Sequence, residues 1–229
     1  MHALVTAFRW REVESGLAGS PELLGFRDDR GRSWLHLCCG ANPKKRRLRA
    51  TDGVKTATVL LAAGLDLDRE AFREGTWKAT PLWYAIARGE NLPLARFLLE
   101  RGADPNHCLW AAAHHDDPAA IELLVASGAE IDPVAEDETP FLHAVRWSRF
   151  RAAEALLRLG ADVNSQDGRG MTALHYMLKK GSEERHVRMV IEHGARGDLP
   201  NGEGVTAVEL MKRKRVPGLR RMAERLSRG

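Results

Sequence analysis

The chain has 229 residues, of which 44% are hydrophobic and 29% are charged, and its formal net charge is +4. This composition is typical of a folded globular protein and excludes an intrinsically disordered chain. No apolar run approaches the roughly 18 residues that span a bilayer. Residues 1–12 have neither the apolar core nor the cleavage site of a secretory signal. We therefore expect a cytoplasmic protein that does not associate with membranes.

The cysteine content and the net charge further limit the class of protein and the kind of partner. Cys38, Cys39 and Cys108 are an odd number of cysteines in a chain without a secretory signal, which argues against a disulfide framework. We expect all three to be small buried side chains. The small positive charge permits a partner with an acidic surface but does not require nucleic acid.

The N-terminal third of the chain is irregular. Residues 1–26 predict a capping segment with two short helices, 3–10 and 11–18, and a turn at 21–24. A first helix pair, at residues 27–68, has helices near 34–39 and 56–63. Between them, residues 41–55 form an insertion with Pro43 and the basic run 44–49, a composition that predicts a loop.

The rest of the chain predicts a series of regular units within a single domain that covers residues 1–229. Each unit is expected to be a pair of helices joined by a turn, because apolar residues recur at helical spacing. The predicted units are residues 77–106, 107–132, 133–164 and 167–198, followed by a C-terminal capping unit at 201–226.

Two motifs recur in phase along these units. The opening Thr80-Pro81-Leu82 returns at Thr139 and Thr172, and these last two threonines are 33 residues apart. A Gly-Ala pair followed by acidic or amide residues ends the helix pairs. Its glycines are Gly102, Gly128, Gly160 and Gly194, with spacings of 26, 32 and 34 residues.

Each motif has a physical reason. Threonine caps a helix N-terminus, and proline fits the first helical turn because its missing N–H is not needed there. Glycine supplies the left-handed end of the second helix, and Asp or Asn suits the turn that follows. One helix pair cannot bury its own apolar face, so neighbouring pairs must stack.

The two motifs resemble those of the ankyrin repeat, over about residues 27–226. The resemblance implies an all-α solenoid of about five to six stacked helix–turn–helix units with short β-hairpin loops. It also implies a monomer that binds another protein and has no catalytic, cofactor or metal site. His36 and His175 fall on the opening histidine of the family, whose imidazole bridges the backbones of adjacent turns.

The resemblance also implies a concave binding surface, made by the hairpin tips and the ends of the first helices. The tip positions are Arg30, Arg32, Trp77, Lys78, Glu136, Glu138, Arg169 and Met171. The helix-end positions are Arg88, His114, His115, Arg146, Trp147, Lys179 and Lys180. Most of these residues are basic, so we expect a partner with an acidic surface. Arg146 and Trp147 are adjacent and belong to the residue types that dominate binding hot spots.

Alternatives remain open. The basic insertion 44–49 is a candidate site for nucleic acid or a phosphate-bearing ligand, although it lacks the interleaved aromatic residues that stack on bases. His114 and His115 beside Asp116 and Asp117 suggest a metal site, but adjacent helical residues point about 100° apart and rarely ligate one ion. The chain has no phosphate-binding glycine loop and no nucleophile elbow.

The biological setting is also open. The richness in Arg, Ala and Leu favours a bacterial source. A stand-alone repeat chain of this kind would act as an adaptor, an immunity protein or a delivered effector.

Overall fold

The computed structural model describes residues 1–71, 73–74 and 77–227, and for 73–74 and 77–78 it describes the backbone alone. Its contacts separate two compact units. The N-terminal unit contains residues 1–112 and 123–129, and the C-terminal unit contains residues 113–122 and 130–229. Helices α8 (Leu109–His114) and α9 (Pro118–Ala126) contribute residues to both units.

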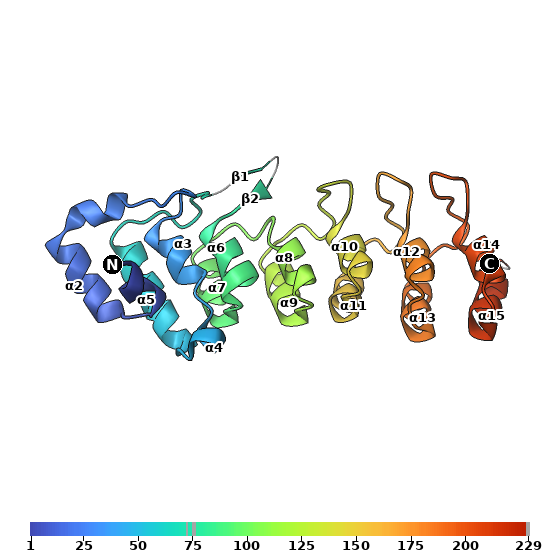
Figure 1. Ribbon diagram of the computed structural model, residues 1–229, viewed down its shortest axis with the longest axis horizontal. Coiled ribbons are helices and arrows are strands. Elements are labelled where there is room, and N and C mark those ends of the chain that lie inside the picture. The colour runs from blue at the N-terminus through green and yellow to red at the C-terminus, as the bar shows by residue number, and fades with distance from the viewer. Residues whose placement is uncertain (72, 75–76, 228–229) are drawn as a thin grey trace. The chain divides into compact units, whose positions relative to one another are not determined.

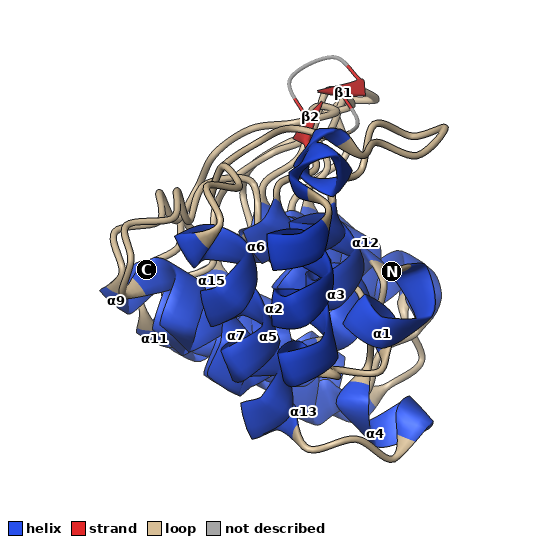
Figure 2. Ribbon diagram, turned by 90° about the vertical axis from the view of Figure 1, so that its left-hand side faces the viewer, coloured by secondary structure: helices blue, strands red, loops and turns tan. Residues whose placement is uncertain are grey.

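The N-terminal unit is a stack of helices with one small β-hairpin. Its elements are α1 (His2–Thr6), α2 (Trp10–Gly19), η1 (Pro21–Gly25), α3 (Trp34–Cys39), α4 (Pro43–Arg46), α5 (Ala50–Ala62), β1 (Arg73–Glu74), β2 (Trp77–Lys78), α6 (Pro81–Tyr84), η2 (Ala85–Gly89) and α7 (Leu92–Leu99). The helix α5 packs against α2, α3 and α7, and α3 packs against α6. The antiparallel strands β1 and β2 lie at the opposite end of the helices from α4 (Figure 2).

The C-terminal unit is more regular, and beyond residues 113–122 its described part contains successive helix pairs (Figure 1). The pairs are α10 (Pro140–Arg146) with α11 (Phe150–Arg158), α12 (Ala173–Lys180) with α13 (Glu184–Glu192), and α14 (Ala207–Arg213) with α15 (Pro217–Leu226). The first helices α10, α12 and α14 pack in a row, and a loop projects beyond each of their N-terminal ends (Figure 1). The predicted all-α stack of helix pairs is therefore confirmed, whereas the division into numbered repeats stays a prediction.

The opening motif caps its helix as expected. Thr139 Oγ1 accepts a hydrogen bond of 3.3 Å from the backbone N–H of Leu142, and Pro140 is the first helical residue. Thr80 does the same for Trp83 at 3.3 Å. These bonds satisfy one of the backbone donors that a helix N-terminus leaves without a partner.

The opening histidines join adjacent turns, which confirms the expected structural role. His36 Nδ1 accepts the backbone N–H of Ser33 at 3.1 Å, so Nε2 carries the proton and donates to the carbonyl of Arg69 at 2.8 Å. His175 Nε2 donates in the same way to the carbonyl of Val205 at 2.9 Å. Each imidazole thereby links its own helix start to the next loop along the chain.

The interior is formed by leucine, alanine and a few aromatic side chains. In the C-terminal unit, Phe141, Leu142, Leu156 and Leu174 are among the largest fully buried side chains. The three cysteines are buried as predicted, and burial raises the pKa of each thiol. None of the helices in the described part of the chain is long and apolar enough to cross a bilayer.

The capping segment and the insertion differ from the prediction. The first predicted helix is interrupted because Phe8 adopts a φ of 56°, so α1 ends at Thr6 and α2 begins at Trp10. The insertion is not a loop throughout, since it contains α4 and the first residues of α5. Asn42 Oδ1 caps α4 by accepting the N–H of Lys45 at 3.0 Å. The Asn-Pro pair acts here as a helix start and not as a turn.

Gly89 marks a close approach of two backbones in the N-terminal unit. A Cβ atom at this position would lie 2.2 Å from the carbonyl oxygen of Cys39. We expect Gly89→Ala to lower the free energy of unfolding by about 1–3 kcal/mol, because backbone must move to admit the methyl group. Urea denaturation checks this against Gly19→Ala, whose Cβ meets no atom within 4 Å. Equal stabilities of the two variants would contradict the close approach.

Candidate functional site

The N-terminal unit holds five of the residues predicted to bind a partner. Arg30 and Arg88 are exposed, but Arg32 is half-buried and forms an ion pair of 2.7 Å with Asp28. Burial of Asp28 opposes its ionisation, yet hydrogen bonds from Arg32 and from the backbone lower its pKa. The backbones of Trp77 and Lys78 form β2, while their side chains lie outside the described residues.

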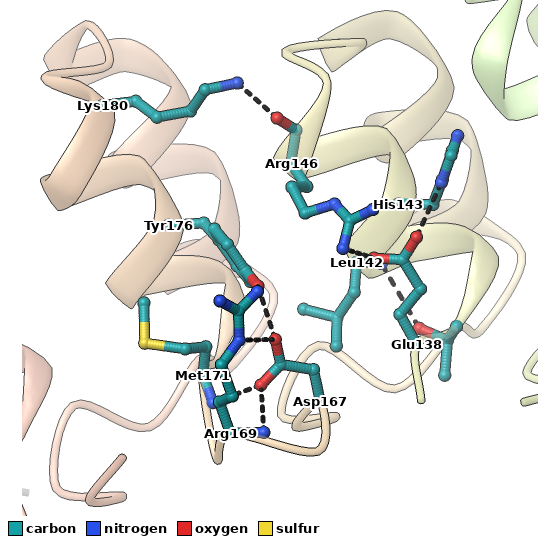
Figure 3. A network of polar contacts seen from close by, with 10 residues as sticks. Glu138, Leu142, His143, Arg146, Asp167, Arg169, Met171, Tyr176 and Lys180 are labelled. Atoms are coloured by element: carbon teal, nitrogen blue, oxygen red, sulfur yellow. Dashed lines mark hydrogen bonds and ion pairs between the residues drawn. The ribbon is translucent and has the colours of Figure 1, made fainter. Parts of the chain in front are cut away.

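The C-terminal unit brings a larger group of predicted residues together around Glu138. This carboxylate is 4% exposed, with Oε1 2.8 Å from His143 Nδ1 and Oε2 3.1 Å from Arg146 Nη1 (Figure 3). The expectation that Glu138 faces a partner from a hairpin tip is therefore wrong. It precedes the cap Thr139, and its side chain turns back onto α10, where it holds Arg146 and His143 in place.

An aromatic group lies next to this carboxylate. Trp147 is 50% exposed, and its ring centre is 6.2 Å from that of His143 and 6.0 Å from that of His114. The rings of His114 and His143 are 5.8 Å apart. Burial lowers the pKa of His114, and the nearby His143 lowers it further. We name Trp147, His143 and His114 the aromatic patch.

A second buried carboxylate anchors the next hairpin loop. Asp167 Oδ2 accepts a hydrogen bond of 2.5 Å from the Tyr176 hydroxyl, which also lies 3.3 Å from Arg169 Nη2 (Figure 3). Burial raises the pKa of Tyr176, and the hydrogen bond to Asp167 raises it further, whereas the positive charge of Arg169 opposes the shift. Tyr176 of α12 therefore ties the hairpin loop at Asp167 and Arg169 to its own helix.

The ends of α10 and α12 are also tied together directly. Lys180 Nζ donates to the carbonyl of Arg146 and lies 3.2 Å from Ser148 Oγ. Lys179 is exposed beside it. These contacts make the C-terminal ends of two successive helices one surface.

The other predicted residues lie around this group. Glu136 is exposed in the hairpin before α10, and His115 is exposed just after α8. Met171 is half-buried, with its sulfur 3.7 Å from Asn201 Nδ2. No cluster of three or more His, Cys, Asp or Glu side chains within the described ranges is arranged to hold a metal ion.

Sequence reasoning missed His143, Asp167 and Tyr176 as members of the site. His143 stands four residues after its cap Thr139, whereas the buried His175 stands three residues after Thr172. One extra residue turns a side chain by about 100° around a helix, which moves the imidazole from the interior toward the surface. This spacing was visible in the sequence, but the hydrogen bond of Asp167 to Tyr176 was not.

Comparison with known proteins agrees with this geometry. The family model for the ankyrin repeat matches residues 77–108, and the model for multiple ankyrin repeats matches residues 109–157. Inversin from Gallus gallus is 34% identical over 110 residues, which is 47% of this chain and 10% of inversin. The chain therefore spans about a tenth of the length of this curated relative.

Solved structures show the same fold. The human ASB11 ankyrin repeat domain gives a TM-score of 0.73 at 21% identity, with 91% of this chain and 90% of that domain covered. The ankyrin repeat domain of Bcl-3 gives a TM-score of 0.72 at 22% identity, with coverages of 100% and 97%. The similarity to chicken and human proteins does not bear out the expectation of a bacterial source. The family models identify residues 77–157 as ankyrin repeats, and the caps and the solved structures show that the chain has the ankyrin-repeat fold.

Proposed function

We propose that the chain is a non-catalytic interaction module that binds a partner protein on the face formed by α10, α12 and their hairpin loops. The observation that carries the proposal is the aromatic patch, in which a half-exposed tryptophan lies beside two histidines. Tryptophan and arginine are the residues most enriched at binding hot spots. The partner we propose has an acidic surface, and the chain acts as a cytoplasmic monomer in an adaptor, immunity or effector-type role.

The surface is held in place before any partner arrives. Glu138 fixes Arg146 and His143, and Asp167 fixes Tyr176 and the hairpin backbone at Arg169 and Met171. Side chains that are already ordered lose little conformational entropy on binding. This supports recognition by a rigid surface and not by a segment that folds on contact.

We expect Trp147→Ala to weaken partner binding by more than about 2 kcal/mol, which is roughly 30-fold, because it removes the exposed ring of the patch. The measurement is affinity capture from extract of the native cells at moderate salt, followed by titration of the captured protein. Leu159→Ala is the matched control, since Leu159 is also an exposed apolar residue, at 37%, but lies at the end of α11. A partner that binds all three proteins equally would refute the assignment of the site.

A second candidate function is the binding of nucleic acid or a phosphate-bearing ligand at the basic insertion. The observation in its favour is that α4 is an ordered, capped turn and not a loop. Lys45 is paired with Glu90, and Arg46 donates to the carbonyl of Thr6, which leaves Lys44, Arg47 and Arg49 as exposed cations. In the capture experiment, this function would appear as nuclease-sensitive material that is retained equally by Trp147→Ala and lost steeply with salt.

A further inference from the structure

The C-terminal ends of the first helices in the C-terminal unit carry a repeated basic position. Arg146, Lys179 and Arg213 each stand seven residues after the residue that caps their helix, which is Thr139, Thr172 or Thr206. Figure 1 shows α10, α12 and α14 in succession, and α10 packs on α12 and α12 on α14, so we expect equivalent positions to form a line across the unit. We name these three residues the cationic row.

No acidic side chain interrupts the helix ends on which the row lies. Residues 146–149, 179–182 and 212–216 contain no Asp or Glu. They contain eight lysines and arginines, which are Arg146, Arg149, Lys179, Lys180, Lys212, Arg213, Lys214 and Arg215. The nearest acid on α14, Glu209, is engaged in the capping box, where it accepts the N–H of Thr206 at 3.0 Å. A single cation at a helix C-terminus complements the helix dipole. Runs of up to four cations exceed what that role needs.

One residue of the cationic row is held in place by a buried carboxylate, and the other two are exposed to solvent. Arg146 uses Nη1 to contact the buried Glu138, which leaves other donors of its guanidinium for a ligand. Lys179 and Arg213 are exposed, and no ion pair joins either of them to another residue in the described part of the chain. The row therefore offers positive charge whose position along the stack is set by helix packing.

The spacing of the row selects the ligand. Packed helices lie about 8–10 Å apart, so neighbouring cations of the row are separated by about this distance along the stack. A peptide in the extended polyproline II conformation advances about 3.1 Å per residue with three residues per turn, so every third side chain lies on the same face and meets the next cation. We propose that the cationic row binds an extended acidic segment of a protein, with carboxylates at every third residue and an apolar side chain over Trp147. The proposal rests on the proposed function and names the partner segment of that same surface.

The test uses two synthetic fluorescent peptides of one composition. Both contain one leucine and three glutamates in a Gly-Ser background, with the glutamates at every third position in the first and consecutive in the second. We expect the spaced peptide to bind the full chain at least about tenfold more tightly than its isomer in fluorescence anisotropy. Equal affinities would overturn the proposal, because net charge alone would then account for binding.

Matched charge reversals locate the site. The double variant Lys179→Glu with Arg213→Glu should weaken binding of the spaced peptide at least about tenfold. The spaced peptide should then bind no more tightly than its isomer. The control variant Arg151→Glu with Arg188→Glu makes the same change in net charge at two exposed residues of α11 and α13. It should weaken binding of the spaced peptide less than about threefold. An equal loss in both double variants would overturn the assignment to the row.

Three further outcomes test the inference, and the last two separate it from the proposed function. If single-stranded DNA of equal charge displaces the spaced peptide at lower concentration than the unlabelled peptide does, the row binds nucleic acid and the inference is wrong. If capture of a partner depends on Trp147 but the spaced peptide shows no preference, the inference fails while the proposed function stands. If the spaced peptide binds through the cationic row but Trp147→Ala captures the same proteins as the wild type, the proposed hot spot at Trp147 is wrong and the proposed peptide site is supported.

Discussion

Replacing Phe141 by alanine should lower the free energy of unfolding of the C-terminal unit by about 3–5 kcal/mol, the range measured for large aromatic deletions in protein cores. Phe141 is fully buried at the second position of α10, directly after the capped Pro140. Because α10 packs on both α11 and α12, the cavity would open between three helices that cannot all close around it.

Urea denaturation followed by circular dichroism measures this loss, with the slope of the transition fitted for each variant, because a repeat array can unfold in stages. Val134→Ala is the control, since Val134 is apolar but 68% exposed and should change stability by less than about 0.5 kcal/mol. A loss below about 1 kcal/mol for Phe141→Ala would contradict a close-packed interior at this position.

The stability of the N-terminal unit should fall by about 3 kcal/mol between pH 6.5 and pH 4 through His36 alone. Burial lowers the pKa of His36 from 6.5 to about 4, although its hydrogen bond to the carbonyl of Arg69 works in the opposite direction. In this interval the unfolded chain takes up a proton at His36 and the folded chain does not. The contribution is therefore fully present above about pH 6.5 and is lost as the pH falls toward 4.

The control for this pH dependence is His36→Gln. Glutamine suits the third position of a capping box and does not titrate, so the variant keeps the contact with Ser33 but loses the proton uptake. Over the same pH interval, we expect the free energy of unfolding to fall by about 3 kcal/mol less in the variant than in the wild-type chain. Proton NMR of the wild-type His36 ring gives a direct check, and a midpoint near 6.5 would contradict the buried neutral imidazole.

Local sequence patterns predicted the structure correctly wherever a side chain acts on residues next to it in the chain. The threonine caps at Thr80 and Thr139 and the helices that follow them were readable because a hydroxyl meets a backbone N–H three residues away. The opening histidines His36 and His175 were assigned through the family resemblance, and their bonds to Arg69 and Val205 agree with it. At the insertion, the same local rules were misapplied, since Asn42 and Pro43 start a helix.

Local sequence patterns could not predict which side chains come together in the candidate site. Glu138 was counted as a tip residue, and only packing decides that its side chain is buried against Arg146 and His143. The same holds for Tyr176, whose hydroxyl meets Asp167 nine residues earlier in the chain. Whether a polar side chain faces water or a neighbouring turn depends on which turns stack beside it.

The sequence by itself determined that this protein is a stack of capped helix pairs, because periodicity, caps and turn glycines act over a few residues and repeat along the chain. The tertiary structure alone decided which side chains form one surface. Trp147 meets His114 across 33 residues of chain, and Lys180 reaches Arg146 across 34. Such contacts depend on the angle and spacing at which successive helix pairs pack, and short-range patterns in the sequence do not specify these quantities.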